Sequence, residues 1–280
     1  MGEAADRWRA LVEGRLAEME RLQAGRGDVG GAHWDKRVKR AGRGATASAD
    51  GDPMLPRLRR AVGRSGTATV LDVGSGPGRF TLAIAPRVQR VTAVDPSKKM
   101  LSFLRKRAKE AGITNVRTVT GQWQDVEVDS ADVVLCCHVL PLIPDVVPFV
   151  RKLDAAAHRR VLLYLGAHAA DAVVDPFWRR FHGSPRKPGA SYVDAWAVLE
   201  EEGFDVSVEV VEMRTWSRHE TLADAVEVYR DQLVLPRTKE VEAELTKLLG
   251  PWLQRRNGHL CAPFRTQPAA ILSWVPATAL

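Results

Sequence analysis

Short apolar runs alternate with longer amphipathic segments along most of the chain. The runs are rich in Val, Ile and Leu, and they predict strands at residues 70–73, 91–94, 116–120, 131–138 and 160–165. Several of the stretches between them carry apolar residues at steps of three and four, the spacing of a helix with one buried face. Strands and helices that alternate in this way are typical of a parallel sheet covered by helices on both faces.

Two more strands are expected near the C-terminus. Residues 204–213 alternate apolar and polar positions, and residues 269–275 form a further apolar run. Between these strands lie about fifty residues with the pattern of two helices, 221–233 and 238–255, which is more than a turn requires. We therefore expect an α/β fold: a doubly wound, mostly parallel seven-stranded sheet, with its last strand antiparallel and a helical insertion at about residues 214–266.

A helical addition precedes this sheet. The pattern predicts an amphipathic helix at 6–23, a short helix at 33–38, a small polar linker at 42–51 and a helix at 52–62 capped by Asp52. Residues 1–64 are therefore taken as an N-terminal segment and residues 65–280 as the main domain. Later in the chain, Ser97 can cap the helix that Gly112 ends, and Ser191 with Asp194 forms a capping box.

A glycine-rich loop follows the first predicted strand directly. The stretch Gly74-Ser75-Gly76-Pro77-Gly78 stands where a chain leaving a parallel strand turns into a helix, and Asp95 ends the next strand. Such carboxyl ends form the edge at which open α/β sheets bind ligands. The dinucleotide fingerprint G-x-G-x-x-G fails, because Arg79 holds its third glycine position.

An acid, Asp72, stands two residues before the first glycine and gives the motif D-x-G-x-G-x-G. This form resembles motif I of the class I S-adenosylmethionine-dependent methyltransferases, and Asp95 resembles the acid of their second motif. The resemblance implies S-adenosylmethionine as cofactor and S-adenosylhomocysteine as product. It implies that Asp72 helps to place the methionine ammonium and that Asp95 accepts hydrogen bonds from both ribose hydroxyls. The cofactor-binding residues expected from these motifs are Asp72, Gly74, Ser75, Gly76, Gly78, Asp95 and Pro96.

The third motif of that family, G-D-A, is replaced by Gly121-Gln122-Trp123. Gln122 can accept a hydrogen bond from the adenine amino group, and Trp123 can cover the ring by stacking. The alternatives are that Asp125 serves instead, or that Trp123 belongs to the core.

His138 ends the fourth strand, a position that lies beside the methyl donor in this family. It is the candidate general base, since a neutral imidazole accepts a proton near pH 7. The alternative is a histidine that contacts the cofactor or fills the wall. The neighbouring Cys136 and Cys137 lack the Pro-Cys pattern of cytosine-C5 enzymes and are interpreted as packing residues.

Acceptor residues cannot be carried over from the family. In many members, segments before the first strand fold over the cofactor as a lid; the alternative here is helices packed permanently on the sheet. Aromatic and basic residues gather at 177–182, where they are expected to line the mouth of the substrate site. Others gather in the insertion, where they form a substrate pocket, a dimer surface or a satellite core. The insertion residues concerned are Trp216, Arg218, His219, Tyr229, Arg230 and Trp252.

The composition narrows the class of protein. The chain has 280 residues, 45% of them hydrophobic, which supports an ordinary globular core. Its three cysteines give neither a disulfide framework nor a metal-binding spacing, so no metal is expected. The N-terminus lacks the apolar core of a signal peptide, and the most apolar run is too short to span a bilayer, so we expect a cytoplasmic protein.

The formal net charge of +7 raises the question of nucleic acid. A basic cluster at residues 36–43 could contact phosphates, although Arg is interspersed with acids throughout the chain, which favours a solvated surface. The sequence therefore predicts a methyltransferase for a small-molecule acceptor that works by in-line displacement. The alternatives are an RNA methyltransferase and a non-catalytic protein that binds S-adenosylmethionine.

Overall fold

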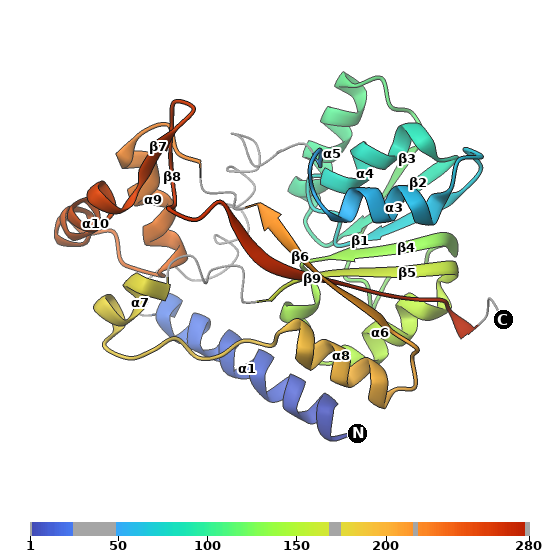
Figure 1. Ribbon diagram of the computed structural model, residues 1–280, viewed down its shortest axis with the longest axis horizontal. Helices are drawn as coiled ribbons and strands as arrows, with labels where there is room; N and C mark the ends of the chain where they lie inside the picture. Colours follow the sequence, from blue (N-terminus) through green and yellow to red (C-terminus); the bar gives the residue numbers. More distant parts are fainter. Residues whose placement is uncertain (1, 25–48, 168–174, 215–217, 278–280) are drawn as a thin grey trace.

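The structure is a computed structural model that describes residues 2–24, 49–167, 175–214 and 218–277. Its centre is a seven-stranded sheet in the order β3-β2-β1-β4-β5-β9-β6 (Figure 1). The strands are β1 Thr69–Val73, β2 Arg90–Asp95, β3 Val116–Thr120, β4 Ala131–Cys137, β5 Ala157–Gly166, β6 Ser207–Arg214 and β9 Thr266–Trp274. The first five pair in parallel, and β9 runs antiparallel to both β5 and β6. The predicted α/β fold is confirmed, antiparallel last strand included.

Helices cover both faces of this sheet. One face carries α1 Glu3–Ala24, α6 Val146–Ala155 and α8 Tyr192–Glu201, and the other carries α3 Met54–Val62, α4 Arg79–Ile84 and α5 Lys98–Glu110 (Figure 1). The central strands serve both layers, because successive side chains point to opposite faces. In β4, Val134 packs in the α6 layer and Val133 in the α3 layer.

Short-range signals set several helix boundaries as expected. The Ser97 side chain accepts a hydrogen bond from the Met100 N–H at the start of α5, and Gly112 takes a left-handed φ of 68° after its end. Ser191 and Asp194 form the expected capping box of α8. Asp52 accepts a hydrogen bond from the Met54 N–H at 2.8 Å and so begins α3.

The insertion forms a satellite body beside the sheet (Figure 1). It contains α9 Leu222–Gln232, α10 Lys239–Trp252, β7 Gln254–Arg256 and β8 His259–Cys261, and α7 Asp175–His182 packs with it in a separate hydrophobic cluster. The second predicted helix is too long at its end, because α10 stops at Trp252. A hairpin follows, turned by Asn257 and Gly258, both at positive φ.

The first helix joins the two bodies. Trp8 and Val12 pack in the sheet's core, whereas Met19 and Leu22 pack against the satellite cluster. The Trp8 indole N–H donates to the Ile143 carbonyl at 2.8 Å. Through these contacts α1 packs in the layer over the sheet and also reaches the satellite cluster.

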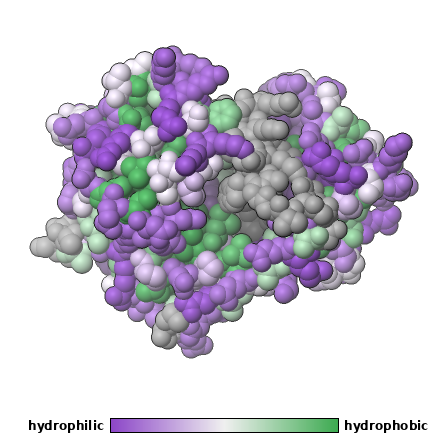
Figure 2. All heavy atoms as spheres, turned by 180° about the vertical axis from the view of Figure 1, so that it is seen from behind, coloured by the Kyte–Doolittle hydropathy of each residue, from purple (hydrophilic) through white to green (hydrophobic). Residues whose placement is uncertain are grey.

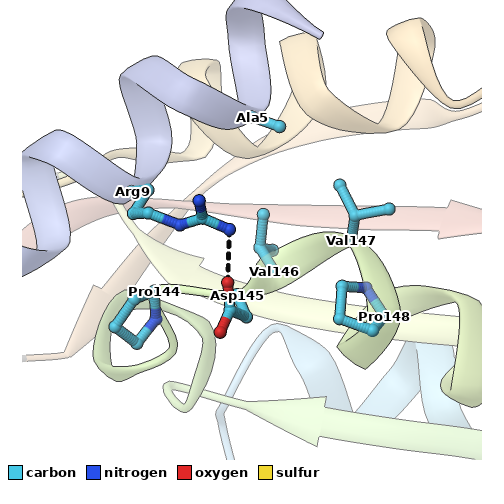
Figure 3. A pocket seen from close by; sticks show the side chains of 7 residues that line it. All are labelled: Ala5, Arg9, Pro144, Asp145, Val146, Val147 and Pro148. Atoms are coloured by element: carbon cyan, nitrogen blue, oxygen red, sulfur yellow. Dashed lines mark hydrogen bonds and ion pairs between the residues drawn. The ribbon is translucent and has the colours of Figure 1, made fainter. Parts of the chain in front are cut away.

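Polar contacts hold the same helix at its start. The Glu201 carboxylate accepts hydrogen bonds from the Ala4 and Ala5 N–H groups, which lack partners within the helix. Figure 3 shows Arg9 reaching from α1 to Asp145, just before α6. The expected helix at 33–38 and most of the linker at 42–51 lie outside the described residues.

Apolar side chains gather in these cores, and hydrophilic residues dominate the face shown in Figure 2. Within the described ranges, no helix is both long enough and apolar enough to cross a membrane.

Candidate active site

The glycine loop between β1 and α4 is folded back onto β2. Gly74, Gly76 and Gly78 all have left-handed φ values, of 73°, 53° and 84°. The N–H groups of Gly74 and Ser75 donate to the Val94 carbonyl at 2.8 and 3.0 Å. The loop therefore lies against the carboxyl end of β2, beside Asp95.

The three glycines meet different surroundings. A Cβ on Gly74 would lie 2.2 Å from Val139 Cγ2, and one on Gly78 would lie 2.2 Å from Leu104 Cδ1, so both glycines serve close packing. A Cβ on Gly76 would meet no heavy atom of the described residues within 4 Å. The backbone of Gly76 is therefore bare on a side that is open to a ligand.

Asp95 links the loop to the next helix. One carboxylate oxygen accepts from the Gly76 N–H and the other from the Ser97 N–H, both at 2.8 Å, and the residue is 8% exposed. Burial raises the pKa of this carboxyl group, while the two N–H groups lower it. Each oxygen has a second lone pair, so the carboxylate can also accept from a diol.

Asp72 and Ser75 add two buried polar groups at this edge. The Asp72 carboxylate accepts a hydrogen bond from the Thr81 hydroxyl at 2.5 Å, and burial raises its pKa from 3.8 to about 6. The Ser75 hydroxyl is buried and has no hydrogen-bond partner within the part of the chain that the structure describes. A ligand with an ammonium group, hydroxyls and an acceptor oxygen fits this set of groups.

Comparison with known proteins bears on the same segment. Residues 70–158 match the model of a methyltransferase domain. The match covers about a third of the chain and identifies this segment as a methyltransferase domain. The topology, the glycine loop and the two acids all agree with that assignment.

Three curated relatives resemble this methyltransferase segment. An uncharacterized methyltransferase, YcgJ of Bacillus subtilis, is 33% identical over 112 residues, which cover 39% of this chain and 44% of the relative. Ubiquinone biosynthesis O-methyltransferase of Methylocella silvestris is 34% identical over 111 residues, covering 39% and 43%. Ribosomal RNA small subunit methyltransferase G of Neisseria gonorrhoeae is 44% identical over 72 residues, covering 25% and 34%. The matches span less than half the length of each relative.

A solved structure extends the likeness of the fold to the whole chain. Magnesium protoporphyrin IX methyltransferase from Synechocystis PCC 6803, with bound S-adenosylhomocysteine, has a TM-score of 0.53 and 15% identity. The alignment covers 99% of this chain and 100% of that one. At this identity the likeness concerns the fold.

In the third methyltransferase motif, Trp123 does not lie where the sequence predicted a contact with adenine. Trp123 is 3% exposed in the core, and its indole N–H lies 3.4 Å from the Phe149 carbonyl. A ring enclosed by α6 has no free face for adenine, so the structure contradicts stacking by Trp123 and supports the core alternative. Gln122 is exposed just beyond β3, as are Asp125 and, just beyond β2, Pro96.

His138 takes a strained backbone conformation directly after β4. Its φ of 59° lies in the left-handed region, which costs a non-glycine residue about 1 kcal/mol or more. Its N–H donates to the Tyr164 carbonyl at 2.7 Å, and its ring lies 4.7 Å from the Tyr164 ring. Because the next residue, Val139, packs against Gly74, His138 stands beside the glycine loop.

The thiols of Cys136 and Cys137, just before His138, are packing groups. Cys136 is buried in the core, and burial raises the pKa values of both Cys136 and Cys137. This agrees with their interpretation as packing residues.

An ion pair lies at the same edge of the sheet. It was not predicted from the sequence. Asp52, before α3, pairs with Arg79, the first residue of α4. From the sequence, Arg79 was used only to exclude a dinucleotide-binding motif, and Asp52 was interpreted only as a helix cap. The missed signal was an arginine directly after the last glycine of the loop, where its side chain can reach the ligand edge.

The aromatic and basic residues of the insertion form a satellite core. His219, Tyr229 and Arg230 are each at most 6% exposed, and the Tyr229 ring packs at a tilt against His219 and edge-on against Trp252. Of the aromatic and basic segment 177–182, Phe177 and Trp178 join this core. Arg218 is exposed, and Trp216 lies outside the described residues.

Proposed function

We propose that this protein is an S-adenosylmethionine-dependent methyltransferase that transfers the methyl group to a small-molecule acceptor. The observation that carries the proposal is the open side of Gly76 between two buried carboxylates, Asp72 and Asp95. A loop backbone that packing does not need on that side is suited to a ligand lying across it.

Each group at this edge has a role toward the cofactor. Asp95 accepts from the ribose hydroxyls with the lone pairs that Gly76 and Ser97 leave, and Asp72 pairs with the methionine ammonium. The Ser75 hydroxyl offers a donor to the methionine carboxylate, and Gln122 offers its amide oxygen to the adenine amino group. The bound cofactor supplies a methyl group already activated by the sulfonium.

The remaining work of the protein is alignment and proton transfer. Proximity and orientation supply much of the acceleration when the nucleophile is held in line at about 3–3.5 Å. His138 stands where the fourth strand ends and takes a proton from the acceptor if the nucleophile has to lose one.

Two basic residues near α3 are held within the protein, whereas Arg59, Arg60 and Arg64 are exposed. Arg57 donates to Glu209 at 2.9 Å, and Arg159 donates to the carbonyls that end α3. Both guanidinium groups therefore have partners within the protein. The basic cluster at 36–43 lies outside the described residues.

A calorimetric titration with S-adenosylmethionine, S-adenosylhomocysteine and NAD tests the cofactor. We expect saturable binding of the two sulfur ligands, no binding of NAD, and loss of binding in Asp95→Ala. Asp129→Ala is the matched control, because Asp129 is an exposed acid remote from the loop. Absent binding in the unmodified protein would contradict the proposal.

Transfer of labelled methyl from the cofactor into the low-molecular-weight fraction of a cell extract tests the reaction. Binding without transfer to any compound would leave the non-catalytic alternative.

RNA methylation is the second candidate, favoured by the net charge and by the similarity to an rRNA methyltransferase over 72 residues. It requires RNA binding that weakens steeply as salt rises and that falls when residues 36–43 are neutralised. Label that enters RNA rather than small molecules would establish it.

A further inference from the structure

Tyr164 stands at the ligand edge next to His138. It lies in β5 two residues before the strand ends, and its register partner in β4 is Cys137. Its side chain faces the layer that contains α3 and α4, where it meets the Phe80 ring edge-on at 6.4 Å. The carboxyl ends of β4 and β5 therefore bring Tyr164 and His138 together.

The hydroxyl group of Tyr164 is buried without a hydrogen-bond partner among the described residues, and Tyr164 is 0% exposed. A hydroxyl left in this way costs about 1–3 kcal/mol relative to a satisfied one. Phenylalanine would fill the same space without that cost. Buried polar groups are normally hydrogen-bonded, so an unsatisfied hydroxyl requires an explanation. A ligand that accepts its hydrogen bond is one such explanation.

The charged groups near this hydroxyl are paired within the protein. Burial raises the Tyr164 pKa, as does the negative charge of Asp52, while the positive charges of Arg79 and Arg57 oppose this rise. Asp52 pairs with Arg79 through one oxygen and binds the Met54 N–H through the other. The wall beside Tyr164 thus carries paired charges, Asp52 with Arg79 and Glu209 with Arg57.

This electrostatic balance selects among acceptors. A carboxylate would need an excess positive charge, and an ammonium an excess negative one, and the Asp52–Arg79 pair supplies neither. A neutral hydroxyl group fits: its oxygen accepts from the Tyr164 O–H, and its own proton is available to the neighbouring imidazole.

We propose that the Tyr164 hydroxyl binds the oxygen of a neutral hydroxyl acceptor beside His138, so that this enzyme is an O-methyltransferase for alcohols or phenols. An oxygen lone pair forms the new O–CH3 bond, and the electrons of the S–CH3 bond pass to sulfur. The O–H proton goes to His138 and then to solvent. This inference rests on the proposed function and specifies its acceptor.

Tyr164→Phe tests the inference, with Tyr192→Phe on α8 as the matched control on the opposite face of the sheet. Without ligand, we expect the thermal midpoint of Tyr164→Phe to stay the same or to rise by about 2–4 °C, because an unsatisfied group is removed. A fall of several degrees would show that the hydroxyl is bonded within the protein, which overturns the inference.

Transfer is the second measurement. Tyr164→Phe should bind S-adenosylhomocysteine as the unmodified protein does, yet transfer label at least about tenfold more slowly into the extract fraction. Tyr192→Phe should change neither. Equal transfer by Tyr164→Phe and the unmodified protein would overturn the role of the hydroxyl while leaving the proposed function intact.

The stability of the product identifies the acceptor. We expect labelled ethers, which survive alkaline hydrolysis. Label released by alkali indicates methyl esters, and label held by cation exchange indicates methylamines; either result overturns the hydroxyl assignment. If the unmodified protein binds S-adenosylhomocysteine but labels nothing, the proposed function itself fails.

Discussion

The Asp95 carboxylate accepts a hydrogen bond from the Gly76 N–H at 2.8 Å. The acid assigned to the ribose therefore also holds the loop on which the cofactor would lie.

Asp95→Ala should consequently lose more than ligand contacts. Each bond to the charged carboxylate contributes about 1.5–3 kcal/mol, so we expect affinity for S-adenosylhomocysteine to fall on the order of a hundredfold or more. Calorimetry measures the affinity, and amide exchange of Gly76 and Ser97 should quicken. Unchanged affinity would contradict the ribose assignment.

Binding should depend on pH through Asp72. Burial raises the pKa of this carboxyl group to about 6, and only the ionised form attracts an ammonium group. Affinity for S-adenosylhomocysteine should therefore decline as the pH falls through about 6. In Asp72→Asn, affinity should be low and nearly independent of pH over the same range.

The stability of the ligand-free protein should respond to Asp72 in the opposite sense. Because the folded pKa lies above the unfolded value of 3.8, this residue's contribution is full below that value and is lost as the pH rises through about 6. The difference in unfolding free energy between the unmodified protein and Asp72→Asn, measured against pH, isolates this contribution. A difference that does not vary with pH would contradict the raised pKa.

Alanine at the loop glycines should separate packing from binding. Gly76→Ala has open space for its Cβ and should cost only about 1–2 kcal/mol for the left-handed backbone, but the methyl group would stand where the ligand lies. Gly74→Ala should lose more stability, since its Cβ meets Val139 at 2.2 Å. Thermal unfolding and calorimetry on both variants make the comparison. Full cofactor affinity in Gly76→Ala would place the ligand elsewhere.

Two tryptophan substitutions test how α1 is held. Trp8→Phe removes the donor to the Ile143 carbonyl and leaves a gap in a fully buried site, so unfolding free energy should fall by at least about 1 kcal/mol. Trp196→Phe is the control, because Trp196 is 43% exposed and bonds only to a surface glutamate, Glu200. Denaturant titration measures both. Equal losses of unfolding free energy in Trp8→Phe and Trp196→Phe would mean that the docking of α1 adds little to the stability of the protein.

The sequence predicted the sheet and the cofactor loop because these depend on local, repeated signals. Apolar runs identified the seven strands of the sheet, and capping residues such as Ser97 fixed helix starts. The order of glycines and acids placed Asp72 and Asp95 at one edge, since consecutive parallel strands end together.

The features that the sequence did not predict depend on contacts between residues far apart in the chain. An aromatic residue just after a strand looks the same whether it faces a ligand or the core, and only the position of α6 decides that Trp123 is buried. The pairing of Asp52 with Arg79 joins residues far apart in sequence, so no local pattern predicts it. The hairpin after α10 had a signal, Asn257-Gly258, that the helical pattern obscured.

The packing of α1 both in the sheet's core and in the satellite cluster has an evolutionary consequence. Because Trp8 stabilises the sheet and Leu22 the satellite body, the two bodies should unfold as one cooperative unit rather than as separable modules. A new acceptor preference therefore cannot be acquired by exchanging the insertion alone. The second half of α1 would have to be inherited with it.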